Sequence, residues 1–153
     1  HHIYVDADKV MLWVKTDNKT PGNYIQQIKY APNYLDRKEA LDYFAKKGMP
    51  ELTMGLTDKF APLRRSSIEK LEDSKIAEDA KVMEGIEKIA NTDKDRITKA
   101  AAISYLAKTS NAKYKSLYEK NITDSSYSVA GAALEGIIGL EAAKAYLLAK
   151  KYS

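Results

Sequence analysis

Residues 93–106, with the sequence DKDRITKAAAISYL, contain the pattern that decides the fold. In this stretch a small residue precedes an isoleucine, a leucine follows three positions later, and an aspartate stands ten positions before the isoleucine. The order of small, aliphatic and apolar residues recurs three more times. The four sets are Ala40-Leu41-Phe44, Ser67-Ile68-Leu71, Ala102-Ile103-Leu106 and Ala133-Leu134-Ile137. The chain therefore carries a degenerate internal repeat.

Charged residues also recur at fixed distances from the aliphatic position of the repeat. An aspartate lies ten residues before the aliphatic position in three segments, at Asp58, Asp93 and Asp124. A cation lies four residues before it in three segments, at Arg37, Arg64 and Lys99. Such a tetrad also arises by chance in amphipathic helices, but the aligned aspartates favour a true repeat. We expect the aspartates to cap helices, the small residues to allow close helix approach and the apolar residues to fill the core.

Helical periodicity fills the chain from residue 20 onward. The predicted helices cover 20–30, 35–47, 49–57, 62–72, 75–90, 94–108, 112–120, 125–139 and 141–151, and the last of them is expected to be a modest cap of the array. Before residue 20, β-branched and aromatic residues at 3–5 and 10–14 predict two short strands joined by a polar turn at 6–9. One helical pair per repeat predicts an all-α fold, a HEAT-like superhelical stack of antiparallel helix pairs, with a short N-terminal β segment.

The start of the chain suggests how it is organised. His1 and His2 are its only histidines and no methionine precedes them, so we interpret residues 1–2 as the remnant of an expression tag. Residues 3–19 are expected to be the end of a truncated β domain, and residues 20–153 a helical repeat domain. On this interpretation we expect the chain to be a piece of a longer protein.

Charge and hydropathy exclude two classes of partner. The formal net charge is +4, from 25 Lys plus Arg against 21 Asp plus Glu, and the signs are interleaved along the chain. Without a basic stripe, and with only four arginines, we expect no nucleic-acid partner. No apolar run reaches the ~20 residues that span a bilayer, so no membrane partner is expected.

The composition also argues against catalysis by this chain. It has no cysteine and no histidine beyond the expected tag. A zinc-binding H-E-x-x-H helix and a nucleophile paired with histidine are therefore impossible in its body. We predict no catalytic, cofactor-binding or metal-binding residues and no cofactor.

Tyrosine is unusually common, with 11 residues against two phenylalanines. An early cluster comprises Tyr24, Tyr30, Tyr34 and Tyr43. Tyrosine suits positions that are half buried and half wet. We expect packing at the edges of the helical array, and use in an interface is the alternative.

Two stretches resemble a known family. Residues 30–41, YAPNYLDRKEAL, and residues 58–64, DKFAPLR, look like the C-terminal region of bacterial zinc aminopeptidases of the aminopeptidase N type. Residues 5–13, VDADKVMLW, resemble the segment that leads out of the small β domain of those enzymes.

The resemblance implies a role within a larger enzyme. The zinc-binding catalytic domain would lie upstream, so zinc would be a cofactor of the parent enzyme and not of this chain. The helical domain would pack on the parent's catalytic and β domains, help enclose the active-site chamber and influence access of peptide substrates. The alternative is a stand-alone HEAT-like scaffold that presents a concave surface to a protein partner.

Overall fold

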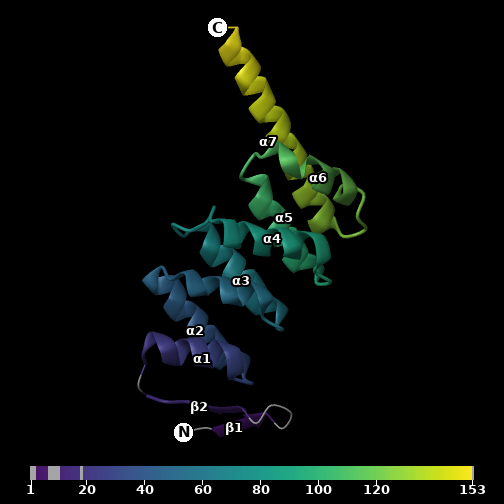
Figure 1. Ribbon diagram of the computed structural model, residues 1–153. Helices are drawn as coiled ribbons and strands as arrows, with labels where there is room; N and C mark the ends of the chain where they lie inside the picture. The colour runs from purple at the N-terminus through teal and green to yellow at the C-terminus, as the bar shows by residue number, and fades with distance from the viewer. Residues whose placement is uncertain (1–2, 7–10, 18, 153) are drawn as a thin grey trace. The chain divides into compact units, whose positions relative to one another are not determined.

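The computed structural model describes residues 3–6, 11–17 and 19–152. The expected tag and most of the expected polar turn lie outside these residues. Contacts between Cα atoms divide the chain after Ala77 into two compact units. Figure 1 shows that helices dominate both, and the predicted all-α class with a short N-terminal β segment is confirmed.

The first unit begins with a β hairpin. Strand β1 (Ile3–Asp6) pairs antiparallel with β2 (Met11–Val14), with Ile3 opposite Val14. Helices α1 (Pro21–Tyr30) and α2 (Tyr34–Lys47) follow, then the 3-10 helix η1 (Pro50–Thr57) and helix α3 (Ala61–Glu72). Helix α1 packs on α2, and η1 packs on α3. Leu41, Phe44, Leu52 and Leu71 form the centre of this core.

The second unit consists of helices alone among its described residues. They are α4 (Ala80–Thr92), α5 (Arg96–Ala107), the 3-10 turn η2 (Ala112–Tyr114), α6 (Lys115–Asn121) and α7 (Tyr127–Lys151). Helix α5 packs on both α4 and α7, and α6 packs on α7. Gly136 of α7 lies against the ring of Tyr118, because a Cβ atom there would be 2.6 Å from the ring. Close approach of α6 and α7 therefore depends on glycine.

The repeat positions are buried in three of the four segments. The small residues Ala40, Ser67, Ala102 and Ala133 are all fully buried. The aliphatic residues Leu41, Ile68 and Ile103 are at most 3% exposed. Leu134, however, is 46% exposed, so the prediction that it fills the core is wrong. Leu134 lies on the side of α7 opposite the buried residues that pack on α5 and α6.

The aligned aspartates have a different role from the one predicted. Each accepts a hydrogen bond from a backbone N–H two residues later. The donors are Phe60 to Asp58 at 2.9 Å, Asp95 to Asp93 at 2.9 Å, and Ser126 to Asp124 at 2.8 Å. These donor residues are the N-caps of α3, α5 and α7. The aspartates thus form Asx turns that lead the chain into each helix, two residues before the cap.

Several predicted helices differ from the observed ones, among them the predicted helix 112–120, which is the 3-10 turn η2 followed by α6. Helix α4 begins at Ala80, because residues 73–78 form turns after α3. Residues 49–57 form a 3-10 helix, in which Gly55 packs so closely on Leu41 and Ser67 that a Cβ atom would clash with both.

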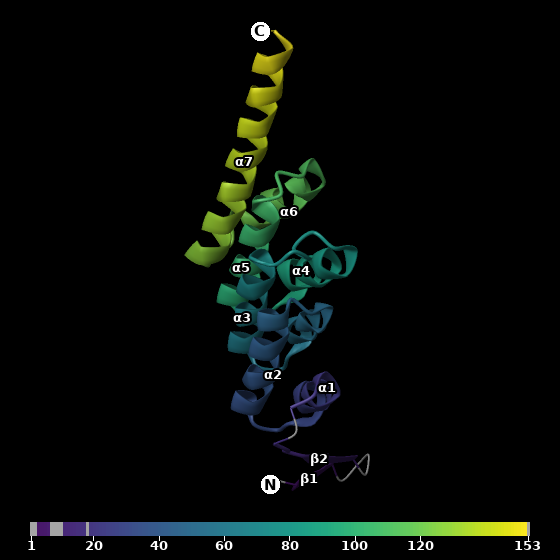
Figure 2. The same ribbon diagram turned by 90° about the vertical axis from the view of Figure 1, so that its left-hand side faces the viewer.

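Helix α7 is one continuous helix of 25 residues, where two helices separated near residue 140 were predicted. An interior glycine such as Gly139 weakens a helix by only about 1 kcal/mol, and no proline or turn sequence follows it. The prediction of a separate capping helix at 141–151 is therefore wrong. The C-terminal part of α7 instead extends beyond α5 and α6 (Figures 1 and 2).

Candidate functional site

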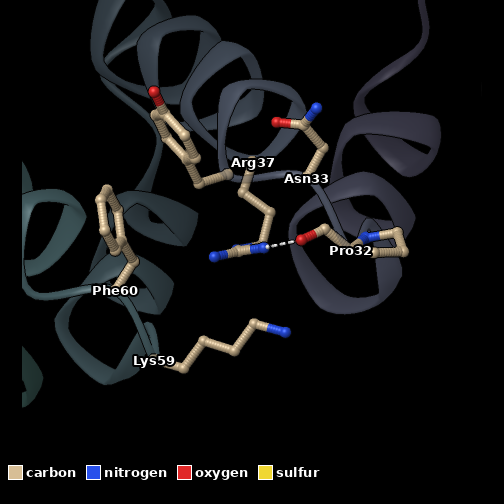
Figure 3. Close-up of a pocket in the computed structure, with 6 residues that line it drawn as sticks. Pro32, Asn33, Arg37, Lys59 and Phe60 are labelled. Atoms are coloured by element: carbon tan, nitrogen blue, oxygen red, sulfur yellow. Dashed lines mark hydrogen bonds between the residues drawn. The ribbon is translucent and has the colours of Figure 1, made fainter.

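The first unit contains a pocket of about 560 Å³ at the starts of helices α2 and α3. Figure 3 shows the side chains around it. They are Pro32, Asn33, Tyr34, Arg37, Lys59 and Phe60.

The N-cap residues of α2 and α3 form part of the pocket lining. Asn33 is the N-cap of α2, and its side chain accepts a hydrogen bond of 2.8 Å from the backbone N–H of Leu35. Phe60 is the N-cap of α3, and Pro62 follows at a position in the first turn that suits proline. Because both helices begin here, residues that precede a helix start line the pocket from two sides.

Arg37 is buried beneath the pocket, with its side chain 5% exposed. Its Nε donates to Asp58 Oδ2 at 2.9 Å, and its Nη2 donates to Asp58 Oδ1 at 3.2 Å. Its Nη1 donates to the backbone oxygens of Ala31 and Pro32, at 3.1 Å and 2.8 Å. Four of its five N–H groups are therefore used within the protein. This arginine holds the pocket together rather than offering a free cation to a ligand.

Asp58 connects the pocket to helix α3. In addition to Arg37, its carboxylate accepts the backbone N–H of Phe60, and its backbone oxygen accepts a hydrogen bond of 2.8 Å from Arg64 Nη1. Two cations of the repeat thus meet one aspartate of the repeat. The arrangement fixes the loop before α3 relative to the loop before α2.

The rim of the pocket is aromatic and partly wet. The rings of Tyr34 and Phe60 lie 4.7 Å apart between centroids, at 40° to each other. Tyr34 is 44% exposed and Phe60 is 38% exposed. Lys59 is exposed beside them. Exposed aromatic rings are typical of surfaces that bind other proteins, whereas lysine is depleted at the centre of such surfaces and suits their rim.

A strong electrostatic interaction in the second unit lies at a helix contact. The hydroxyl of Tyr114 donates to Glu87 Oε1 at 2.5 Å, and Lys113 lies 3.3 Å from the same oxygen. The hydrogen bond from Tyr114 lowers the pKa of Glu87. These groups tie η2 to α4.

No site residue was predicted from the sequence, and the pocket was missed. The sequence nevertheless singled out two of the residues involved, because Arg37 and Asp58 both occupy aligned charged positions of the internal repeat, which we call the repeat frame. The two stretches that carry the family resemblance, 30–41 and 58–64, meet at this pocket. Tyr34, in the early tyrosine cluster, lies at its rim.

Comparisons with protein-family models, curated proteins and solved structures give no match. Over the described ranges, no helix is long and apolar enough to cross a membrane. Within the same ranges, no three His, Cys, Asp or Glu residues lie close enough together to hold a metal ion.

Proposed function

We propose that the chain is a non-catalytic helical domain of a zinc aminopeptidase of the aminopeptidase N type. One observation carries this proposal. The two sequence stretches that resemble that family are joined in space by the buried Arg37–Asp58 pair, at 2.9 Å. Both stretches therefore contribute to one structural feature of the first unit.

The geometry of the pocket supports a role in protein contact. Tyr34 and Phe60 offer apolar ring surface, and Lys59 adds a positive charge at the rim. Aromatic side chains contribute much of the binding energy at protein interfaces, because they bury a large area with few rotatable bonds. We propose that this surface packs against the parent's catalytic or β domain, where the helical domain encloses the active-site chamber and influences access of peptide substrates.

A stand-alone HEAT-like scaffold is the second candidate. It is supported by the exposure of Leu134 at a repeat position that is buried in the other three segments. An array with an uncovered apolar repeat position offers a surface for a protein partner.

The aminopeptidase assay tests the non-catalytic part of the proposal. The purified chain, supplied with zinc, is expected to leave an aminoacyl-p-nitroanilide uncleaved, because zinc would belong to the parent's catalytic domain. A known zinc aminopeptidase under the same conditions serves as the positive control. Hydrolysis that co-purifies with the chain and is lost on addition of a chelator would overturn the proposal.

A further inference from the structure

Helix α7 carries a stripe of exposed residues on one face. Their spacing alternates between four and three positions, as in the contact seam of a coiled coil. We call them the outer stripe: Tyr127, Gly131, Leu134, Ile138, Glu141, Ala145, Leu148 and the C-cap residue Tyr152. All eight are exposed, and Ile138 and Leu148 are 59% and 48% exposed.

The outer stripe lies on the side of α7 that faces away from the rest of the second unit. The buried residues of α7 are Val129, Ala132, Ala133 and Gly136, and they lie on the opposite side at 100° per residue. Helices α5 and α6 pack on that buried side. The outer stripe is therefore a largely apolar face of about 37 Å in length, with Glu141 as its one charged residue, and no described helix of the second unit covers it.

Charge along α7 identifies the kind of helix that fits this face. After Tyr127, its acidic residues Glu135 and Glu141 come first, and its basic residues Lys144, Lys150 and Lys151 come later. A helix that runs antiparallel to α7 and has the same sequence would place acidic residues beside basic ones. A parallel copy would place Glu141 against its own counterpart within the stripe, which like-charge repulsion disfavours.

We propose that α7 pairs with α7 of a second copy of this chain in an antiparallel coiled coil through the part of the outer stripe that runs from Leu134 to Tyr152. The heptad register sets Ile138 opposite Leu148 of the partner subunit, and Leu134 opposite Tyr152 of the partner subunit. Glu141 then lies opposite Ala145 of the partner subunit, within reach of the partner's Lys144. The proposal is independent of the aminopeptidase assignment, so either one can fail without the other.

Neighbouring leucines provide a matched test of the stripe. Leu147 and Leu148 are both exposed, at 65% and 48%, but only Leu148 belongs to the outer stripe. We expect the purified chain to sediment as a dimer at about 100 µM, and Leu148→Glu to raise the dissociation constant at least about tenfold. Leu147→Glu is expected to leave the dimer intact. Circular dichroism checks that both variants keep their helices.

Two outcomes of sedimentation would overturn the proposal. One is a chain that remains monomeric at about 100 µM, a concentration at which even a weak micromolar dimer is populated. The other is a dimer that Leu147→Glu disrupts as strongly as Leu148→Glu does. In that case another face of the helix would form the contact.

Introduced cysteines test the orientation of the two helices. The chain has no cysteine of its own, so each introduced thiol is unique. On mild oxidation, a mixture of Glu141→Cys and Ala145→Cys chains is expected to yield covalent heterodimers, because these positions face each other across the antiparallel seam. Each variant alone should cross-link little. Efficient cross-linking of Glu141→Cys with itself would indicate a parallel pair and overturn the proposed geometry.

Discussion

Ile103→Asp is expected to unfold the second unit, with a loss of several kcal/mol in the free energy of unfolding. Ile103 is fully buried at the repeat position of α5, which packs on both α4 and α7. A carboxylate at this position would be shielded from water, because Ile103 is 0% exposed. A loss of about 3 kcal/mol in a unit of this size lowers the melting temperature by more than about 10 °C. Thermal melting followed by circular dichroism measures the effect.

The matched control lies on the same helix. Ile97 is 59% exposed, so Ile97→Asp introduces the same group into water and is expected to change stability by no more than about 0.5 kcal/mol. If Ile103→Asp melts at the same temperature as the unchanged chain, the repeat frame does not describe the core.

Arg37→Met is expected to cost about 3–5 kcal/mol, the range for breaking one side of a buried ion pair. The variant leaves the carboxylate of Asp58 without its cation, and that side chain is only 3% exposed. It also removes the donor for the backbone oxygens of Ala31 and Pro32. Methionine fills much of the volume, so the loss reports on charge and hydrogen bonding. Urea unfolding of the full chain measures the change.

The next residue provides the control. Lys38 forms an ion pair with Asp42 at 2.8 Å, but the two side chains are 49% and 43% exposed. Water screens such a pair, so Lys38→Met is expected to change stability by less than about 1 kcal/mol. Equal effects of the two substitutions would show that Arg37 does not hold the loops of the pocket together.

Helix periodicity was sufficient to predict the fold class and most helices. The spacing of apolar residues in α4 is typical of an amphipathic helix. The structure buries Val82, Ile86 and Ile89 on one face of this helix. The continuity of α7 was not predicted, because a glycine-rich helix and two helices joined at a glycine have similar sequences. Packing of Gly136 on Tyr118 favours glycine within this helix, and that contact joins residues distant in sequence.

The role of the aligned aspartates shows a second limit of sequence reasoning. Capping residues and Asx-turn residues are the same amino acids, and both accept backbone N–H groups near a helix start. The repeat frame aligned Asp58, Asp93 and Asp124 correctly. It could not distinguish the cap from a position two residues before it, because helix boundaries are uncertain by that amount.

The pocket depends on pairing that local sequence does not reveal. Arg37 and Asp58 are 21 residues apart, and both are ordinary charged residues in a chain rich in them. Their burial identifies them, and burial arises only when η1 and α3 fold back beside α2. The family resemblance pointed to the same two stretches without indicating that they meet.

The most direct test of the proposed function is the reading frame upstream of Ile3 in the source gene. We expect the frame to continue upstream through a β domain into a catalytic domain with an H-E-x-x-H helix and a downstream glutamate. The chain would then be the helical domain that shapes the chamber of that enzyme. A start codon or a signal peptide immediately before Ile3 would contradict this account and leave the stand-alone scaffold as the better proposal.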